Sequence, residues 1–557
     1  MSASDKKKLR KEEKAVKLTE RQLKEKAEAK KLKRNTVIFV TAMVLVVCIA
    51  LGVLGVRAFN RYGVIERFTI AATVGGHEIN SIELSYFYND AIQAEYNQMY
   101  QNAYQQSSQY PELLITYMYG LDPAKSLAEQ PYNPDDPSIT WADHFVEQAI
   151  NDAKDLYAIY DKAMSENYTL SAEQQAELDQ TLASTEYYAT MYGYSNAESY
   201  LRATYGNGAS MKSYSKYMEK QMIAYAYTSD YAETLEDKFG ETALREYDAK
   251  NPNKYDSFTY TQVYLQSSLF LGEGTKDENG TVTHTDEEKE AARVKAKEIA
   301  DTLAKATSEE EFKKLVSELE INKEKEQVAT KKYENTLYDS VMSVYRDWVA
   351  GTDRAENDTT VLEGTSGSGD SKVINGYYVV MFHNRNDNKM FPANVRHLLV
   401  NFEGGTKDEN NQTVYSDAEK AKAKEEADGY LKAWQDGEKT KESFIELVKA
   451  HSDDSSASTG GLFENITHDS SYVENFLNWS IDPNRKVGDA EVIETEYGYH
   501  VMYFESHNET TYRDAMIEAD MQNEDYDAWY KSIVDPVTAT PGNTSKLRRD
   551  IVLSGAN

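Results

Sequence analysis

The sequence is poor in the two side chains most used for redox and metal chemistry. Among 557 residues it has one cysteine, Cys48, and nine histidines. A single cysteine cannot form an intramolecular disulfide or a paired-thiol metal or redox site, so those classes of site are excluded within one chain. The length allows about three or four domains with substantial cores. Those cores must therefore form without disulfide bonds.

Charged residues are absent from residues 36–56, which predicts a transmembrane helix. At about 1.5 Å per residue this segment spans about 30 Å, the thickness of the hydrocarbon core of a bilayer. Residues 1–35 hold 14 of the chain's 61 Lys and Arg but only 6 of its 93 Asp and Glu. The positive-inside rule places this basic tail in the cytoplasm and the acidic remainder on the far side. We expect a single-pass protein of the cell membrane.

Two alternatives to an uncleaved anchor are considered. A cleaved signal peptide would also be apolar, although this run exceeds an h-region of about 7–15 residues and lacks a small-x-small site before Arg57. Lipidation of Cys48 is the second alternative, but Val47 stands before it where a small residue is usual, and more apolar residues follow. The membrane anchor is the favoured interpretation.

Residues 71–250 predict a helical domain. A hairpin is predicted at residues 73–80, and a helix capped by Asn80 or Ser81 follows it toward Tyr104. Further helices are predicted at residues 141–166, 171–182, 197–205 and 210–239, the second opened by a capping box of Ser171 and Gln174. The hairpin Val74-Gly75-Gly76-His77-Glu78-Ile79, with this order of helices, resembles the N-terminal chaperone domain of SurA-like and PrsA-like extracytoplasmic foldases. The resemblance implies binding of unfolded polypeptides.

A repeat follows this region. The segment Gly274-Thr275-Lys276-Asp277-Glu278-Asn279 recurs 131 residues later as Gly405-Thr406-Lys407-Asp408-Glu409-Asn410. A Lys/Glu/Ala-rich helical pattern follows each segment, and further on Trp348 and Tyr378 correspond to Trp479 and His500. The repeat predicts two tandem copies of one domain, at residues 253–386 and 387–506.

The second copy carries a characteristic order of motifs. It opens on the strand pattern Val395-Arg396-His397-Leu398-Leu399-Val400 and closes on Gly498-Tyr499-His500-Val501. Between them lie Ser452-Asp453-Asp454-Ser455-Ser456-Ala457 and then Gly460-Gly461. This order resembles the parvulin family of peptidyl-prolyl cis/trans isomerases. The resemblance implies an α+β multidomain protein: a transmembrane helix, a helical chaperone domain, and two parvulin-like domains, each a small antiparallel sheet with surrounding helices.

The parvulin resemblance also implies site residues. His397 and His500 would pair their imidazoles beneath the pocket, and Asp454 would lie beside the substrate amide. The residues that would line the proline pocket come from the later part of the copy: Leu462, Tyr472, Phe476, Thr495 and Tyr497. Tyr472 replaces the usual Met, and Leu462 and Phe463 depart from the family's Gly-Gly-Asp-Leu-Gly pattern. Rotation about a peptide bond breaks no bond, so no metal, nucleotide or organic cofactor is expected.

The first copy lacks the corresponding polar groups. Tyr378 stands in place of His500, and no histidine lies within residues 260–270. We interpret residues 253–386 as a degenerate parvulin-like domain that serves as a scaffold or substrate platform. The contrast within one chain indicates that His397, Asp454 and His500 are not required to build the fold.

Residues 507–557 predict a C-terminal helix and tail. The helical pattern from Tyr512 to Val534 ends before Pro536. By the same foldase resemblance this helix returns to the helical domain, with Trp529, Tyr530 and Ile533 as its apolar face. We expect the last 20 residues to trail off.

The predicted function combines these parts. The chain is expected to be a membrane-anchored isomerase and chaperone for unfolded or newly secreted polypeptides with X-Pro bonds, without a nucleic-acid partner. The main alternative is a non-catalytic holdase that uses both parvulin copies as binding platforms, which the altered Gly460-Gly461-Leu462-Phe463 segment favours. A third possibility is a structural cell-surface protein, but that function leaves the placement of the histidines unexplained.

Overall fold

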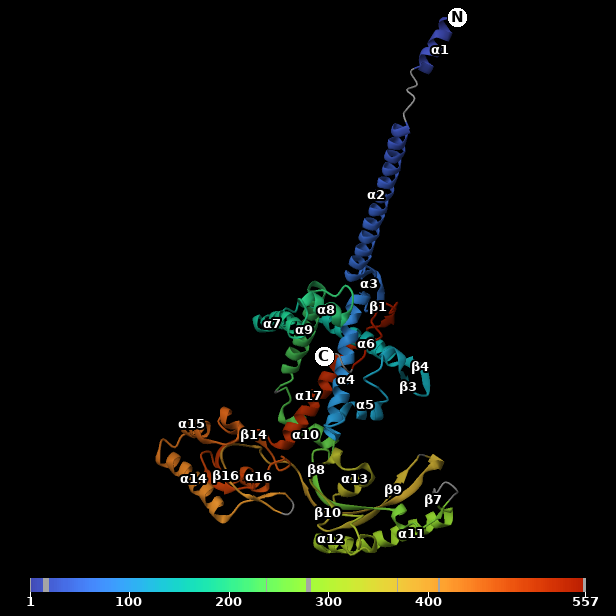
Figure 1. The fold of residues 1–557 in the computed structure, drawn as a ribbon. Helices are drawn as coiled ribbons and strands as arrows, with labels where there is room; N and C mark the ends of the chain where they lie inside the picture. Colours follow the sequence, from blue (N-terminus) through green and yellow to red (C-terminus); the bar gives the residue numbers. More distant parts are fainter. Residues whose placement is uncertain are drawn as a thin grey trace. The chain divides into compact units, whose positions relative to one another are not determined.

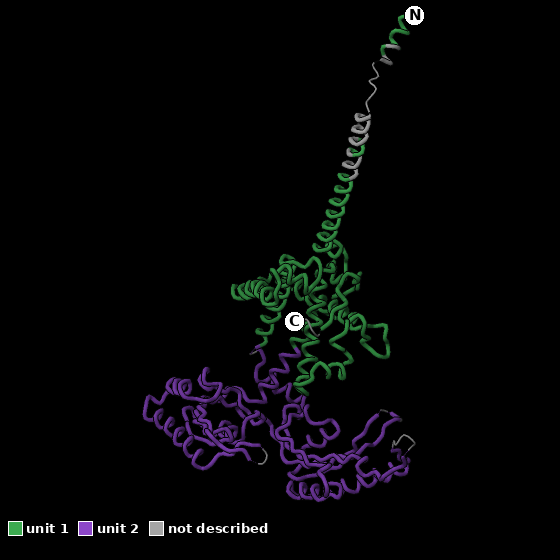
Figure 2. Tube along the Cα trace, in the orientation of Figure 1, with its two compact units in different colours: residues 1–235, 525–557 green, residues 236–524 purple. Residues whose placement is uncertain are grey.

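The computed structural model describes residues 2–13, 20–236, 238–276, 282–367, 369–408 and 411–553. Parts of the predicted basic tail and of both repeated hexapeptides lie outside these residues. The chain forms two compact units, residues 1–235 with 525–557 and residues 236–524, drawn green and purple in Figure 2. The predicted helical domain extends to residue 250, whereas the first segment of the first compact unit ends at Leu235.

Helices α1 (Ala3–Glu13) and α2 (Glu20–Arg61) begin the first unit. The predicted segment 36–56 lies within α2. Its stretch Phe39–Arg61 is long and apolar enough to cross a membrane, and none of the tested stretch is buried. By length and composition it is a candidate membrane span.

The hairpin and helices predicted after the span are present. Strands β1 (Ile70–Val74) and β2 (His77–Asn80) precede α4 (Ser81–Gln106), and the Asn80 side chain accepts hydrogen bonds from the amides of Ile82 and Glu83. The remaining elements are α3 (Val64–Phe68), α5 (Pro111–Tyr119), β3 (Pro131–Asn133), β4 (Asp136–Thr140), α6 (Trp141–Ser165), α7 (Ala172–Met191), α8 (Ala197–Tyr205) and α9 (Met211–Glu233). The capping box of Ser171 and Gln174 is confirmed. Helix α7 is longer than predicted and α9 is shorter.

The C-terminal segment packs on this unit, which corrects the expectation of a trailing tail. The Trp529 ring, near the end of α17 (Tyr512–Val534), stacks on Tyr231 with centroids 3.8 Å apart, and Tyr530 and Ile533 pack against the helical core. Strand β17 (Ala539–Pro541) then pairs with β1, and Leu547 is buried in the same core. The predicted apolar face of the helix is confirmed.

The second unit contains two four-stranded antiparallel sheets with matching strand order (Figure 1). The first has the order β8-β5-β10-β9, formed by Lys331–Leu337, Ser257–Gln266, Val373–Asn386 and Thr359–Ser366. The second has the order β14-β11-β16-β15, formed by Leu462–Ile466, Ala393–Asn401, Gly498–His507 and Ala490–Glu494. Helix α10 (Glu241–Lys250) precedes them.

Each sheet is covered in the same way. One face of the first sheet packs on α11 (Asp286–Leu303) and α12 (Glu309–Ser317), and the other on the short α13 (Ser343–Val349). In the second sheet α14 (Asp417–Asp436) and α15 (Lys441–His451) cover one face and the short α16 (Glu474–Ser480) covers the other. Alternation along a strand sends successive side chains to opposite faces, so every second residue of β11 and β16 faces α16.

Candidate active site

The two predicted histidines meet on the central strands of the second sheet. His500 on β16 pairs with Leu399 on β11, and His397 pairs with Met502, so the two imidazoles are diagonal neighbours on the face that α16 covers. Their Nδ1 atoms are 2.8 Å apart and their rings are nearly parallel, with 19° between the planes. His397 and His500 are 2% and 5% exposed as whole residues. They therefore form one buried, hydrogen-bonded pair.

Two glycines make this arrangement possible. A Cβ on Gly498 would lie 2.1 Å from the carbonyl oxygen of Val400, so a larger residue cannot precede Tyr499 and His500 without a backbone shift. Gly461 has a φ of 67°, and a Cβ there would lie 2.2 Å from the carbonyl oxygen of His397. The amide of His397 donates to the carbonyl of Gly461 at 3.0 Å. The Gly-Gly and Gly-Tyr-His motifs thus fix the backbone on both sides of the imidazoles.

The outer nitrogen of each imidazole faces a polar side chain. Nε2 of His500 lies 2.8 Å from Oγ1 of Thr495. Nε2 of His397 lies 3.6 Å from Oδ1 of Asp454 and 3.5 Å from Oγ of Ser456, at the outer limit of direct hydrogen bonds. Ser456 donates to Oδ1 of Asp454 through its hydroxyl at 2.5 Å and its amide at 2.8 Å. Neighbouring Asp453 instead accepts from the amide of Asn401.

These contacts set the charge state of the site. The His397 ring facing the Asp454 carboxyl lowers the pKa of that group. The hydroxyl and amide of Ser456, which donate to the same carboxyl, lower it further, so the pKa lies well below its usual range. Burial, with the neighbouring His397 ring, lowers the pKa of His500 to about 3. At neutral pH, Asp454 is therefore ionised and His500 is neutral.

Around a neutral His500 the hydrogen bonds follow one direction. The carboxylate of Asp454 can only accept, so Nε2 of His397 carries the proton and its Nδ1 accepts from Nδ1–H of His500. Nε2 of His500 then accepts from the hydroxyl of Thr495, whose oxygen also accepts from the amide of Tyr497. This order fixes both tautomers without a buried charge on His500.

Aromatic rings surround the imidazoles. Phe476 on α16 contacts both of them, with ring centroids 5.4 Å from His397 and 5.7 Å from His500. Phe463 on β14 lies edge-on to His397 at 5.0 Å, and Tyr472 contacts both Phe463 and Phe476. Phe476 is buried whereas Tyr472 is 37% exposed. The rings therefore form an apolar wall that opens to solvent at Tyr472.

The structure brings together most, but not all, of the predicted side chains. His397, His500, Asp454, Thr495, Phe476 and Tyr472 belong to one contact network. Leu462 is half-buried on β14 opposite Arg396, and the Tyr497 side chain is 57% exposed. Tyr472 precedes α16, and Thr495 and Tyr497 precede β16. The sequence reading assigned no role to Ser456, although its place two residues after Asp454 is typical of an Asx turn.

A family model identifies the class of this domain. Residues 377–507 match the model of the PPIC-type PPIASE domain, so this part of the chain is similar to parvulin-type peptidyl-prolyl isomerase domains. The match begins within β10, ten residues before the predicted start at 387, and ends one residue after the predicted end at 506.

Several solved structures are similar to the chain. PrsA from Bacillus anthracis is 19% identical over 27% of this chain and 59% of its own, with a TM-score of 0.16. PrsA from Bacillus subtilis is 13% identical over 72% and 87%, with a TM-score of 0.22. A structure from Campylobacter jejuni, described with PEB4 and Cj1289 as SurA-like chaperones, is 19% identical over 27% and 52%, with a TM-score of 0.17.

The chain thus spans a little over half the length of the B. anthracis and C. jejuni proteins. None of the curated proteins matches it significantly. Because the three TM-scores are below 0.5, the class of the domain rests on the family model alone.

Proposed function

We propose that residues 387–506 catalyse peptidyl-prolyl cis/trans isomerisation. The observation that carries the proposal is the buried pair of His397 and His500 under an aromatic wall, with the Asp454 carboxylate at one end. The PPIC-type domain match over the same residues supports it.

The chemistry needs no bond to break. Rotation about an X-Pro bond is slow because amide resonance opposes it with a barrier of about 18–20 kcal/mol. Twisting removes that resonance, so the carbonyl oxygen loses partial negative charge. A dry wall of Phe476, Phe463 and Tyr472 would hold the prolyl ring and disfavour the more polar planar amide. The Asp454 carboxylate, placed beside the carbonyl oxygen, would destabilise the planar ground state further.

His397 and His500 act as positioning residues in this proposal. Their mutual hydrogen bond and the one from Thr495 hold the two rings rigidly behind the aromatic wall. A neutral His500 keeps its part of the pocket floor free of charge, while His397 orients Asp454. No proton needs to leave the network during catalysis.

The first sheet is proposed to be a degenerate parvulin-like copy. By strand register Gln262 occupies the place of His397 and Tyr378 that of His500. A domain with the same strand order but without the imidazole pair would serve as a scaffold or a binding platform for clients.

The whole chain is proposed to be a membrane-anchored foldase. Helix α2 would anchor it, the basic N-terminal residues would stay in the cytoplasm, and the rest would act on unfolded or newly secreted polypeptides outside it. A non-catalytic holdase is the second candidate. The altered Gly460-Gly461-Leu462-Phe463 segment beside His397 favours it, because that segment forms part of the wall.

The test is catalysis of cis/trans exchange in a short X-Pro peptide, followed by NMR with the full chain in detergent. We expect the His500→Ala variant to lose most of the activity and the matched Tyr378→Ala variant of the first sheet to keep it. Equal loss in both variants would place catalysis elsewhere. Absence of exchange in the folded unmodified chain would leave the holdase.

A further inference from the structure

Two neighbouring cavities in the first unit run along α4 and α6. One measures about 820 Å³ and the other about 400 Å³, and both walls include Ala91, Ala94 and Asp152. Helix α5 and the β3–β4 hairpin border the larger cavity, whereas α9 and the last part of α17 border the smaller one. Because they share wall residues, the cavities form one groove, which we call the α4/α6 groove.

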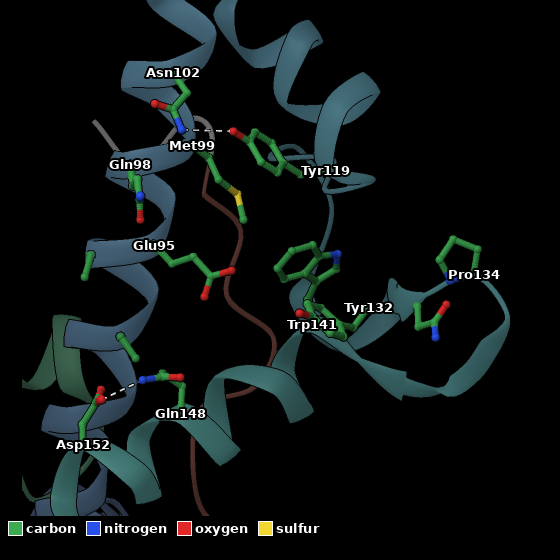
Figure 3. Close-up of a pocket in the computed structure, with 13 residues that line it drawn as sticks. Glu95, Gln98, Met99, Asn102, Tyr119, Tyr132, Pro134, Trp141, Gln148 and Asp152 are labelled. Carbon is green, nitrogen blue, oxygen red and sulfur yellow. Dashed lines mark hydrogen bonds between the residues drawn. The ribbon is translucent and has the colours of Figure 1, made fainter. Parts of the chain in front are cut away.

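The walls of the α4/α6 groove are aromatic. Figure 3 shows Glu95 and Met99 extending from α4 toward Trp141 across the larger cavity. The rings that line the two cavities are Tyr119, Tyr132 and Trp141 in the larger and Tyr217, Tyr225, Tyr526 and Tyr530 in the smaller. The indole N–H of Trp141 is buried and has no hydrogen-bond partner within the described part of the chain.

The groove also holds four carboxylates: Asp90, Glu95, Asp152 and Asp155. Glu95 is hydrogen-bonded to Nε2 of His144, whereas the other three accept from the neutral side chains of Tyr217, Gln148 and Tyr530. None of the described residues that line either cavity is Lys, Arg or His. The wall is thus negative as well as aromatic.

Burial without a cationic hydrogen-bond partner marks three of these carboxylates, Asp90, Asp152 and Asp155. It raises the pKa of Asp90 to about 6 and the pKa values of Asp152 and Asp155 above their usual range. A cation brought into the groove would relieve this unfavourable burial. Among the described residues no group of three or more His, Cys, Asp and Glu is arranged to hold a metal ion, so a metal is not the indicated occupant.

We propose that the α4/α6 groove binds extended client segments that carry Lys or Arg. Tyrosine and tryptophan faces attract ammonium and guanidinium groups, and Asp152 and Asp155 provide the opposite charge. Gln98, Asn102 and Gln148 can hydrogen-bond an extended backbone. The inference rests on the proposed chaperone function and adds selectivity to it: basic, unfolded segments are held in preference to acidic ones.

The test compares short fluorescent peptides of equal length on the full chain in detergent. The three probes alternate Ser with Lys, Gln or Glu, and their binding is followed by anisotropy. We expect the Lys peptide to bind about tenfold more tightly than the Glu peptide. Added salt should weaken binding of the Lys peptide and of neither other peptide. Equal binding of the three peptides would overturn the inference.

Charge-removing variants locate the site. The Asp152→Asn/Asp155→Asn variant should weaken Lys-peptide binding about fivefold to tenfold. The matched control, Glu147→Gln/Asp179→Asn, removes two exposed carboxylates from α6 and α7 outside the groove and should not change it. Circular dichroism confirms that each variant folds. Equal effects of the two variants would mean that binding depends on general charge and not on the groove.

A separate measurement distinguishes failure of this inference from failure of the chaperone function. Suppression of aggregation of a denatured, uncharged client tests holding as such. Suppression without charge preference among the peptides overturns only the inference. No suppression and no binding of any peptide overturns both.

Discussion

The two sheets of the second unit share their strand order and the short helix that covers one face, but they differ in the residues between that helix and the sheet. In the second sheet the Phe476 ring lies 5.7 Å from His500, and the planes are 67° apart. In the first sheet the Tyr345 ring lies 5.7 Å from Tyr378, at 63°. Tyr345 and Phe476 each stand three residues before Trp348 and Trp479. The same packing geometry therefore forms with or without an imidazole.

This comparison separates the needs of the fold from those of the site. Gly376 and Gly498 both lie against a carbonyl of the neighbouring strand, at 2.3 and 2.1 Å for an added Cβ, so both sheets require glycine there. Gln262, at the place of His397, has an Oε1 atom without a hydrogen-bond partner in the described residues. The paired imidazoles belong to the second sheet alone among the described residues.

The largest effect on stability is expected from removal of the aromatic ring that each short helix packs against its sheet. Phe476→Ala and Tyr345→Ala should each lower the free energy of unfolding of the second unit by about 3–5 kcal/mol, because both rings are fully buried. Urea unfolding measures this. Only Phe476→Ala should also weaken isomerisation, so loss of activity in the Tyr345→Ala variant would contradict the difference between the sheets.

The paired glycines give the next effect. Gly498→Ala and Gly376→Ala should each destabilise by about 3 kcal/mol, because the added Cβ meets backbone oxygen that cannot move freely. Thermal unfolding of the two variants is the measurement. A tolerated alanine at either position would show that the backbone relaxes and that the motif glycine is not a steric requirement.

Acid should reveal the buried imidazole. The folded-state pKa of His500, about 3, lies below the unfolded value of about 6.5, so the unfolded state binds more protons between these values. The stability contributed by the neutral ring is complete above about pH 6.5 and falls by about 2 kcal/mol by pH 5.

The His500→Tyr variant, which carries the residue of the first sheet, should lose this part of the pH dependence in denaturant titrations. His383 and His468, whose pKa values are also lowered by burial, contribute equally to both proteins and cancel. An unchanged slope in the variant would mean that His500 does not titrate in this way.

The smallest effect is expected at Asp454. Asp454→Asn keeps the side-chain shape but removes the charge, and it should slow isomerisation about tenfold, equivalent to about 1.4 kcal/mol. Because the pKa of Asp454 is lowered, this carboxyl stays ionised as the pH falls to the range in which aspartates usually titrate. The activity of the unmodified chain should therefore not fall through protonation of Asp454 over that range. The pH profile of prolyl exchange, with Asp453→Asn as the matched control, measures both effects.

Much of this arrangement could be predicted from local patterns. Helix caps at Asn80 and Ser171 depend on neighbouring residues. The recurring turns and tryptophans predicted two tandem copies, and the matching strand order of the two sheets agrees with that prediction. The pairing of His397 with His500 was predictable only through the resemblance to the parvulin family, because local strand patterns do not say which strands lie side by side.

Contacts made across long stretches of sequence were not predictable. Strand β17 is three residues long and ends on Pro541, so only its pairing with β1 defines it. The start of β16 depends on the close approach of Gly498 to Val400, which leaves Thr495 and Tyr497 in a turn. Likewise Arg513 forms ion pairs with Asp248 and Asp256 of the same unit, from about 260 residues away in sequence.

The most direct test replaces the imidazole pair by the residues of the first sheet. The variant His397→Gln/His500→Tyr is compared with the unmodified full chain for prolyl cis/trans exchange by NMR, with circular dichroism as the check of folding. The account predicts a folded protein whose catalysis falls about a hundredfold or more, equivalent to about 2.7 kcal/mol. A folded variant with unchanged catalysis would contradict the claim that the paired histidines make the second sheet the catalyst.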